Sequence, residues 1–259
     1  MIHKWELTIP ELTGDTPRRA YVYLPGWWTE DSDERFPVLY MFDGHNVFYD
    51  EDATYGKSWG LGEYLEYTDT PLIVAAVECN RDPNNGRLSE YSPYTFRYNS
   101  RQRIPGRGKL TMDWLTQVFK PEIDREFPTL PDRDNTFIAG SSMGGLMSLY
   151  ALLEYNTIFS RAAALSPSLW VAPGKVEGLI RSSCLAPGTT LYMDYGSQEL
   201  ANHDQMLRNL GKAARLLLEK GIFLDFRIVP NGDHSEASWE RQIPFFINTL
   251  LYGREQLEE

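Results

Sequence analysis

The sequence predicts a doubly wound α/β fold, in which helices cover both faces of a mostly parallel sheet. Three observations support this prediction. Short apolar runs alternate with longer runs of helical period along most of the chain, which is typical of βαβ units. The run 72–77 is apolar at successive positions, as a strand buried on both faces must be. No linker or repeat divides the 259 residues, so we expect a single domain over 1–259.

The elements are expected in a regular order along the chain. Two antiparallel strands open the fold, at 4–9 and 19–24. The helix near 204–220 has its apolar residues on one face and Gly221 at its C-terminal cap. Parallel strands are expected near 36–42, 72–77, 135–139, 161–165, 189–195 and 222–229. Helices are expected near 58–67, 110–126, 143–156, 204–220 and 236–252.

A GxSxG pentapeptide at 140–144 stands between a strand-like run and a helix-like run. The pentapeptide alone is a weak signal, because Gly and Ser are common residues. Its surroundings strengthen it, since apolar residues recur at helical spacing directly after Met143. Ser142 is therefore expected at a strand-to-helix turn, exposed at the carboxyl edge of the sheet in a strained conformation. We predict that Ser142 is a nucleophile. The alternative is a Gly/Ser-rich connector that merely starts a helix.

A serine hydroxyl needs an adjacent base, usually a histidine held by a carboxylate. Of the four histidines, His3 lies at the amino terminus, His203 at a predicted helix start and His45 directly after the first central strand. His234 lies on a glycine-containing loop after the last strand. In the Ser, acid, His order of an α/β-hydrolase the base belongs on that loop, so we predict His234 as the general base.

The carboxylate that orients the histidine should follow the penultimate strand. Glu199 lies past Gly196, on the loop that leaves the carboxyl edge of the sheet, and we predict it as the acid. Asp194 lies within the predicted strand, where its side chain would be fixed in the sheet, and it remains the alternative; Asp204 lies just beyond both. The competing interpretation of either residue is an ordinary solvated carboxylate in an acidic chain.

An oxyanion hole needs two backbone N–H donors. One is expected from Met143, which follows the nucleophile, and the other from His45, on the loop after the first central strand. Gly44 would let that loop turn so that the His45 amide faces the serine. The residues leave two interpretations of the His45 imidazole open, a wall of the acyl pocket or a cap of the loop.

Two groups of residues are candidates for binding the rest of the substrate. The segment 96–109 is locally basic and could be a lid whose Arg101, Arg103 and Arg107 receive an anionic or catecholate substrate. Its competing interpretation is a solvated loop that balances nearby acids. Trp170 and Trp239 follow segments that border the expected site, as an apolar or sugar-stacking wall or as ordinary core residues.

Six motifs, taken together and in this order, resemble the putative-esterase family. That family includes siderophore, feruloyl and acetylxylan esterases, S-formylglutathione hydrolases and mycolyltransferases. The resemblance implies an α/β-hydrolase fold, a triad of Ser142, Glu199 and His234, and oxyanion donors at His45 and Met143. Glutamate at 199 departs from the aspartate of many members. The motifs are DGHNVF (43–48), EYSPY (90–94), GSSMGG (140–145), ALSPSLW (164–170), MDYGSQE (193–199) and GDH (232–234).

Composition excludes several partners. The net charge of −11 argues against nucleic acid and against anionic membranes. The amino-terminal residues lack the apolar core of a signal peptide and no transmembrane run follows, so a cytoplasmic location is expected. Cys79 and Cys184 lack metal-ligand spacing, a disulfide between them has no support, and the histidines show no HxH or HExxH pattern. We therefore expect neither a metal nor another cofactor, and nothing indicates a homo-oligomer.

The predicted function is that of a serine carboxylic-ester hydrolase, which works through an acyl-enzyme that water then hydrolyses. Its small-molecule substrate could be a siderophore ester, a feruloylated or acetylated oligosaccharide, or a small thioester. An acyltransferase with the same triad and an alcohol acceptor is an alternative. A binding protein on a catalytically dead hydrolase scaffold is another, although the intact order of serine, acid and histidine disfavours it.

Overall fold

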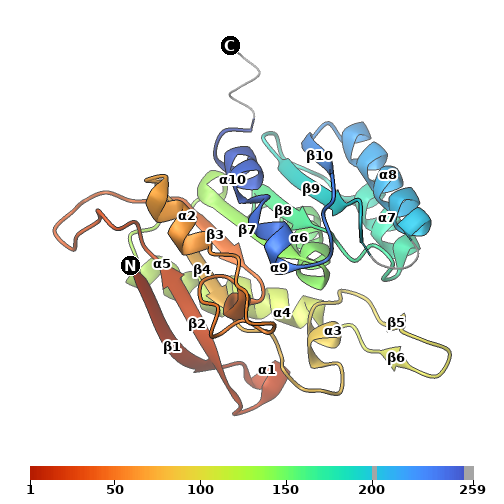
Figure 1. Cartoon of the computed structure of the whole chain (residues 1–259), viewed down its shortest axis with the longest axis horizontal. Coiled ribbons are helices and arrows are strands. Elements are labelled where there is room, and N and C mark those ends of the chain that lie inside the picture. Colours follow the sequence, from red (N-terminus) through yellow and green to blue (C-terminus); the bar gives the residue numbers. More distant parts are fainter. Residues whose placement is uncertain (200–202, 254–259) are drawn as a thin grey trace.

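The centre of the molecule is a mostly parallel sheet (Figure 1). The computed structural model describes residues 1–199 and 203–253, and within them the strand order is β1-β2-β4-β3-β7-β8-β9-β10. β1 and β2 pair antiparallel, β2 joins β4 antiparallel, and all pairs from β4 to β10 are parallel. This confirms the antiparallel start and the doubly wound sheet. The strands are β1 (Ile2–Thr8), β2 (Pro17–Tyr23), β3 (Val38–Met41), β4 (Ile73–Val77), β7 (Thr136–Ser141), β8 (Arg161–Leu165), β9 (Thr190–Gly196) and β10 (Phe223–Val229).

Helices cover both faces of the sheet and enclose two apolar cores. Alternate strand residues point to opposite faces, so Tyr40 of β3 joins one core and its neighbour Leu39 joins the other. The first core packs under α4 to α8, and the second packs under α2 and α10. Among the described residues, no helix is long and apolar enough to cross a membrane. The helices are α1 (Pro10–Thr13), α2 (Leu61–Tyr67), α3 (Gly86–Glu90), α4 (Gly108–Trp114), α5 (Lys120–Glu126), α6 (Met143–Glu154), α7 (Pro173–Ser182), α8 (His203–Glu219), α9 (Glu236–Glu240) and α10 (Ile243–Tyr252), with a π-helical turn at Leu115–Phe119 between α4 and α5.

The structure corrects several expected elements. The predicted helix 236–252 is broken into α9 and α10, because Pro244 lacks an N–H and so favours a new helix start. The basic segment is not irregular, since it forms an antiparallel hairpin of β5 (Phe96–Arg97) and β6 (Arg103–Ile104) that projects beside α3 (Figure 1). Helix α7 was not expected from the sequence, because only two of its residues, Val176 and Ile180, are buried and mark an apolar face.

The strand order also determines where a ligand can bind. β3 lies between β4 and β7, so the chain leaves β3 toward one edge of the sheet and later returns to build the other. In an open parallel sheet this reversal opens a crevice beyond the carboxyl ends of the two strands concerned. Gly44 follows β3, and Ser142 follows β7. The predicted nucleophile and the predicted oxyanion loop therefore meet at the point where this topology favours a site.

Candidate active site

Ser142 occupies the sharp turn between β7 and α6. Its φ of +58° and ψ of −116° lie outside the regions that non-glycine residues favour. Its backbone is tied to the β8 side of the sheet, because the Ser142 amide donates to the Leu165 carbonyl at 2.9 Å and the Ser168 amide donates to the Ser142 carbonyl at 3.0 Å. A Cβ on Gly140 would lie 2.8 Å from the backbone of Gly144, so only glycine fits there. The turn has the features of a nucleophile elbow.

Glu199 and His234 contact each other directly. His234 Nδ1 lies 2.9 Å from Glu199 Oε2, and the Glu199 side chain is almost fully buried while that of His234 is 29% exposed. The carboxylate is held from its other side, since Gly196 N donates to Oε1 at 2.8 Å. His234 and Ser142 line the same cavity. The hydrogen bond fixes Nδ1 of the imidazole on a carboxylate at the cavity that Ser142 also lines. The Ser142 hydroxyl itself lies 3.4 Å from the Ser168 hydroxyl.

Asp194 lies in the sheet and does not contact His234 through any hydrogen bond found in the described residues. Its Oδ1 accepts from the Ser166 amide at 2.9 Å, and its Oδ2 accepts from the Tyr192 hydroxyl at 2.9 Å. Burial raises the pKa of Asp194 to about 7, and the nearby negative charge of Glu199 adds to the rise. The geometry thus gives the two candidate acids different partners, and it is Glu199 that is paired with the histidine.

The loop after β3 carries the predicted oxyanion donor His45. The sharp turn is made by Asp43, whose φ is +57°, while Gly44 is needed because a Cβ there would lie 2.8 Å from the Val77 backbone. Met143 is the first residue of α6, so its N–H has no acceptor within the helix. Asn46 Nδ2 donates to Glu236 Oε1 at 3.1 Å, which joins this loop to the helix after His234.

The His45 imidazole is buried and lines the cavity with one edge. Its Nε2 lies 3.0 Å from Thr54 Oγ1, and the described part of the chain offers its Nδ1 no hydrogen-bond partner. Burial lowers the pKa of His45, so the ring is neutral near pH 7 and contributes no charge to the site. Sequence reasoning left its role open between a pocket wall and a loop cap, and its contacts fit both.

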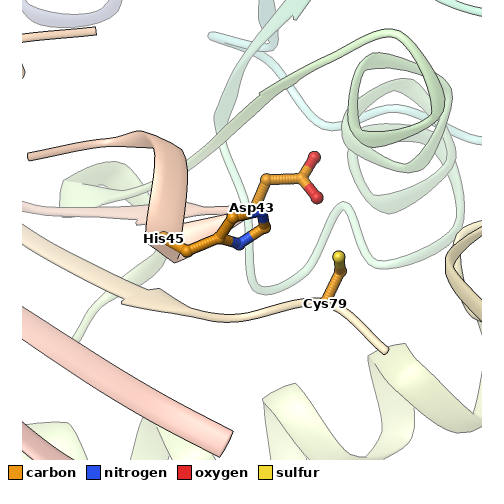
Figure 2. A group of neighbouring side chains, drawn as sticks. All are labelled: Asp43, His45 and Cys79. Carbon is orange, nitrogen blue, oxygen red and sulfur yellow. The ribbon is translucent and has the colours of Figure 1, made fainter. Parts of the chain in front are cut away.

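Asp43, His45 and Cys79 form the one group among the described residues whose donor atoms lie close enough together to suggest a metal site (Figure 2). The Asp43 carboxylate already shares a hydrogen bond with the Cys79 thiol. Both Asp43 oxygens are already bound by Arg87, from Nε at 2.7 Å and from Nη2 at 2.6 Å. Burial also raises the pKa of the Cys79 thiol, which opposes the thiolate that a metal would need. The donor set therefore fits a structural ion pair better than a metal.

A cavity of about 1020 Å³ opens over Ser142 and His234. Its walls carry both signs of charge, and each lysine and arginine of its lining is already paired: Arg87 with Asp43, Arg81 with Glu78, Lys57 with Glu240, and Arg19 with Asp52 and Glu78. The volume is at the upper end of ligand pockets. The charged and polar lining residues include Arg19, Asn46, Glu51, Asp52, Thr54, Lys57, Asn80, Arg81, Asp82, Asn85, Arg87 and Glu236.

The two predicted tryptophans have different surroundings. Trp239 is buried and lines the cavity, with its ring edge-on to His234 at 5.0 Å between centroids. Trp170 is 41% exposed and packs on the hairpin instead, at 5.5 Å from the ring of Phe96 and 6.2 Å from that of Tyr98. Only Trp239 is placed to shape the pocket around the histidine.

The three predicted arginines lie apart from this cavity within the described part of the chain. Arg101 and Arg103 are exposed on the hairpin. Arg107 donates to the backbone carbonyls of Leu12, at 3.2 Å, and Glu11, which anchors the hairpin base on α1. These contacts favour the solvated interpretation of the segment over the lid.

A double replacement of Arg101 and Arg103 by glutamine tests this placement. We expect kcat and KM to change little for a neutral ester and for an anionic or catecholate ester alike, because neither guanidinium reaches the cavity. Arg107 is left in place since its loss would loosen the hairpin. The hairpin would instead close over bound substrate if the double replacement raised KM for the anionic ester alone. In that case high salt should weaken the binding of this ester to the parent, because salt screens the arginine charges.

Several known proteins are similar to this chain in sequence or in structure. A Bacillus subtilis (strain 168) protein described as "Uncharacterized protein YbbA" is 28% identical over 249 residues, covering 92% of this chain and 93% of that protein. An IroE-like serine hydrolase from Shewanella oneidensis has a similar structure, with a TM-score of 0.75, 20% identity and coverage of 95% of this chain and 79% of that one. A ferulic acid esterase gives a TM-score of 0.69, 14% identity and coverage of 96% and 97%.

The structural neighbours establish an α/β-hydrolase fold. The family is established by sequence, because the family model described as "Putative esterase" matches residues 13–245. The chain therefore belongs to this esterase family and is an esterase.

Proposed function

We propose that this esterase works through a triad of Ser142, His234 and Glu199. His234 accepts the Ser142 proton, Ser142 attacks the ester carbonyl, and the amides of Met143 and His45 donate hydrogen bonds to the oxyanion. Glu199 holds the imidazole in the tautomer whose Nε2 can accept that proton. The alcohol leaves with a proton from His234, and water then releases the acid from the acyl-enzyme.

The observation that carries this proposal is the 2.9 Å contact between Glu199 Oε2 and His234 Nδ1, beside a strained serine that lines the same cavity. A strained serine is retained where its position is needed, and a buried carboxylate on an imidazole orients that ring for proton transfer. The backbone N–H groups at the start of α6 favour negative charge at the oxyanion position.

We further propose that the substrate is an ester of a bulky polar group rather than of a long alkyl chain. The cavity walls carry charged groups such as Lys57, Glu51 and Asp82. An alkyl chain placed against them would remove water from charges and gain no hydrogen bonds in return. Feruloyl esters, acetylated oligosaccharides and catecholate siderophore esters all meet the condition of bulk with polarity.

A panel of esters tests both parts. We expect kcat/KM for p-nitrophenyl esters to be highest with acetate or butyrate and to fall steadily to palmitate, because the polar walls disfavour the longer chain. Methyl ferulate, acetylated xylo-oligosaccharide and a catecholate siderophore are assayed beside them. Preference for palmitate would overturn the substrate class, and no turnover of any ester would favour the dead scaffold. Transfer to an added alcohol in preference to water would favour the acyltransferase.

A further inference from the structure

Ser166, directly after β8, has a backbone conformation that serine rarely adopts. Its φ is +45°. In this left-handed region the Cβ crowds the next carbonyl oxygen, so glycine is the favoured residue. Non-glycine residues persist there when their surroundings hold them, and they cluster at functional sites. The strain alone does not assign a role, since Ala172 has a similar φ of +47° without a polar side chain, so the contacts of the Ser166 hydroxyl decide the matter.

The Ser166 hydroxyl lies between one donor and one acceptor. Trp239 Nε1 donates to Ser166 Oγ at 3.0 Å, and Ser166 Oγ donates to Glu199 Oε1 in a short hydrogen bond. An indole N–H can only donate and an ionised carboxylate can only accept, so the hydroxyl hydrogen has a single direction. The indole thus determines that the serine points its hydrogen at Glu199.

The backbone of Ser166 is fixed as well. Its amide donates to Asp194 Oδ1 at 2.9 Å and to the Asp194 carbonyl at 3.2 Å, and the residue is only 3% exposed. Two carboxylates therefore hold Ser166: that of Asp194, in β9, binds its amide, and that of Glu199, on the loop after β9, binds its hydroxyl. A hydroxyl anchored in this way cannot follow a movement of the Glu199 side chain.

Glu199 needs such an anchor more than an aspartate would, because glutamate has one more rotatable bond between backbone and carboxylate. Oε1 accepts from Gly196 N at 2.8 Å and from Ser166, while Oε2 meets His234. Without Ser166, the carboxylate could still turn about the line that joins its contacts to Gly196 and His234. The second bond to Oε1 fixes the plane of the carboxylate and so the direction of Oε2.

We propose that Ser166 is a positioning residue of the esterase reaction, whose hydroxyl, oriented by Trp239, fixes the Glu199 carboxylate on His234. The inference rests on the proposed triad. Ser166 touches neither the substrate nor Ser142 in this role. It acts through Glu199, and removal of its hydroxyl should slow proton transfer without weakening the binding of a small substrate.

The test compares Ser166→Ala and Ser166→Gly, each in the parent and in a Glu199→Ala background, with p-nitrophenyl acetate as substrate. Both variants lose the hydroxyl, but glycine relieves the backbone strain that alanine keeps. We expect both to lower kcat by roughly tenfold to a hundredfold with KM within about twofold of the parent. Ser166→Gly should melt about 2–4 °C above Ser166→Ala, so kcat and stability will not vary together.

In the Glu199→Ala background no carboxylate is left to position, so Ser166→Ala should cause no further loss of kcat. An equal loss in both backgrounds, or a kcat that follows the melting temperature, would overturn the proposal in favour of a purely structural role. Asp69→Gly is the control for strain relief. Asp69 is exposed just beyond the C-terminal end of α2 with a φ of +48°, and its replacement should raise the melting temperature with kcat unchanged.

The same experiment distinguishes a wrong triad assignment from a wrong role for Ser166. If Glu199→Ala leaves kcat unchanged in the parent, Glu199 is not the acid and the Ser166 inference falls with it. If Glu199→Ala is severely impaired and both Ser166 variants retain full kcat, only the positioning role is overturned.

Discussion

Replacement of Ser142 by alanine is expected to abolish ester hydrolysis in a protein that folds normally. The loss should be roughly 10⁴-fold or more in kcat/KM, about 5 kcal/mol of transition-state stabilisation, because the members of a triad act as a unit. Alanine keeps the Cβ and hence the same backbone strain at φ +58°, so the melting temperature should stay close to that of the parent. The measurement is steady-state hydrolysis of p-nitrophenyl acetate beside a thermal melt.

The neighbouring serine supplies a matched control. Ser141 is the last residue of β7 and lines the same cavity, but its side chain stands one position before the elbow. Ser141→Ala should therefore keep most of the activity. A folded Ser142→Ala protein that retains most of the parent's turnover would rule out Ser142 as the nucleophile, and a large loss in Ser141→Ala alone would move the assignment by one residue.

Glu199→Gln is expected to lower kcat/KM by roughly 10²–10⁴-fold, far more than Asp194→Asn. Gly196 N and the Ser166 hydroxyl both donate to Oε1, so the carbonyl oxygen of a glutamine must stay on that side. Its NH₂ group would then face His234 Nδ1 and turn that nitrogen into an acceptor. The imidazole would carry its proton on Nε2 and could no longer accept one from Ser142.

Asp194→Asn is the matched control for that change. Burial raises the pKa of Asp194 to about 7, so near neutral pH the neutral asparagine replaces a carboxyl that is already partly protonated. Its oxygen can still accept from the Ser166 amide. Because the folded pKa lies above the ordinary value near 4, this group stabilises the fold at low pH and that contribution is lost as pH rises toward 7. Asp194→Asn should flatten this part of the stability profile. Greater kinetic damage from Asp194→Asn than from Glu199→Gln would show that Asp194 is the acid.

The parts of the fold that could be predicted are those in which one periodic pattern dominates. The central strands were located because β4 and β7 are buried on both faces of the sheet, so residues such as Val74 and Ile138 stand in unbroken apolar runs. The turn at Ser142 was predicted because the change from strand to helical period falls on a GxSxG, and the structure places Ser142 between β7 and α6. His234 and Glu199 followed from the order of elements, and the structure pairs them through Nδ1 and Oε2.

The parts that could not be predicted depend on contacts between distant segments. Nothing near Ser166 in the sequence indicates that its hydroxyl meets Trp239, 73 residues away, or that its φ is positive. The bidentate pair of Asp43 and Arg87 is likewise visible only once α3 packs beside the loop after β3. The basic composition of the hairpin suggested a role in binding, but composition does not say which way a projecting segment faces.

The hydrogen bond between Asn46 and Glu236 joins positions 190 residues apart in a chain of 259. Contacts of such high sequence separation form late in folding, because closing a long loop costs entropy before any contact rewards it. A chain that has been synthesised only as far as β9 already contains Ser142, but it has neither His234 nor this tether. Hydrolysis by the proposed mechanism therefore requires the complete and folded chain. Partly folded intermediates would expose a serine without the base that makes it reactive.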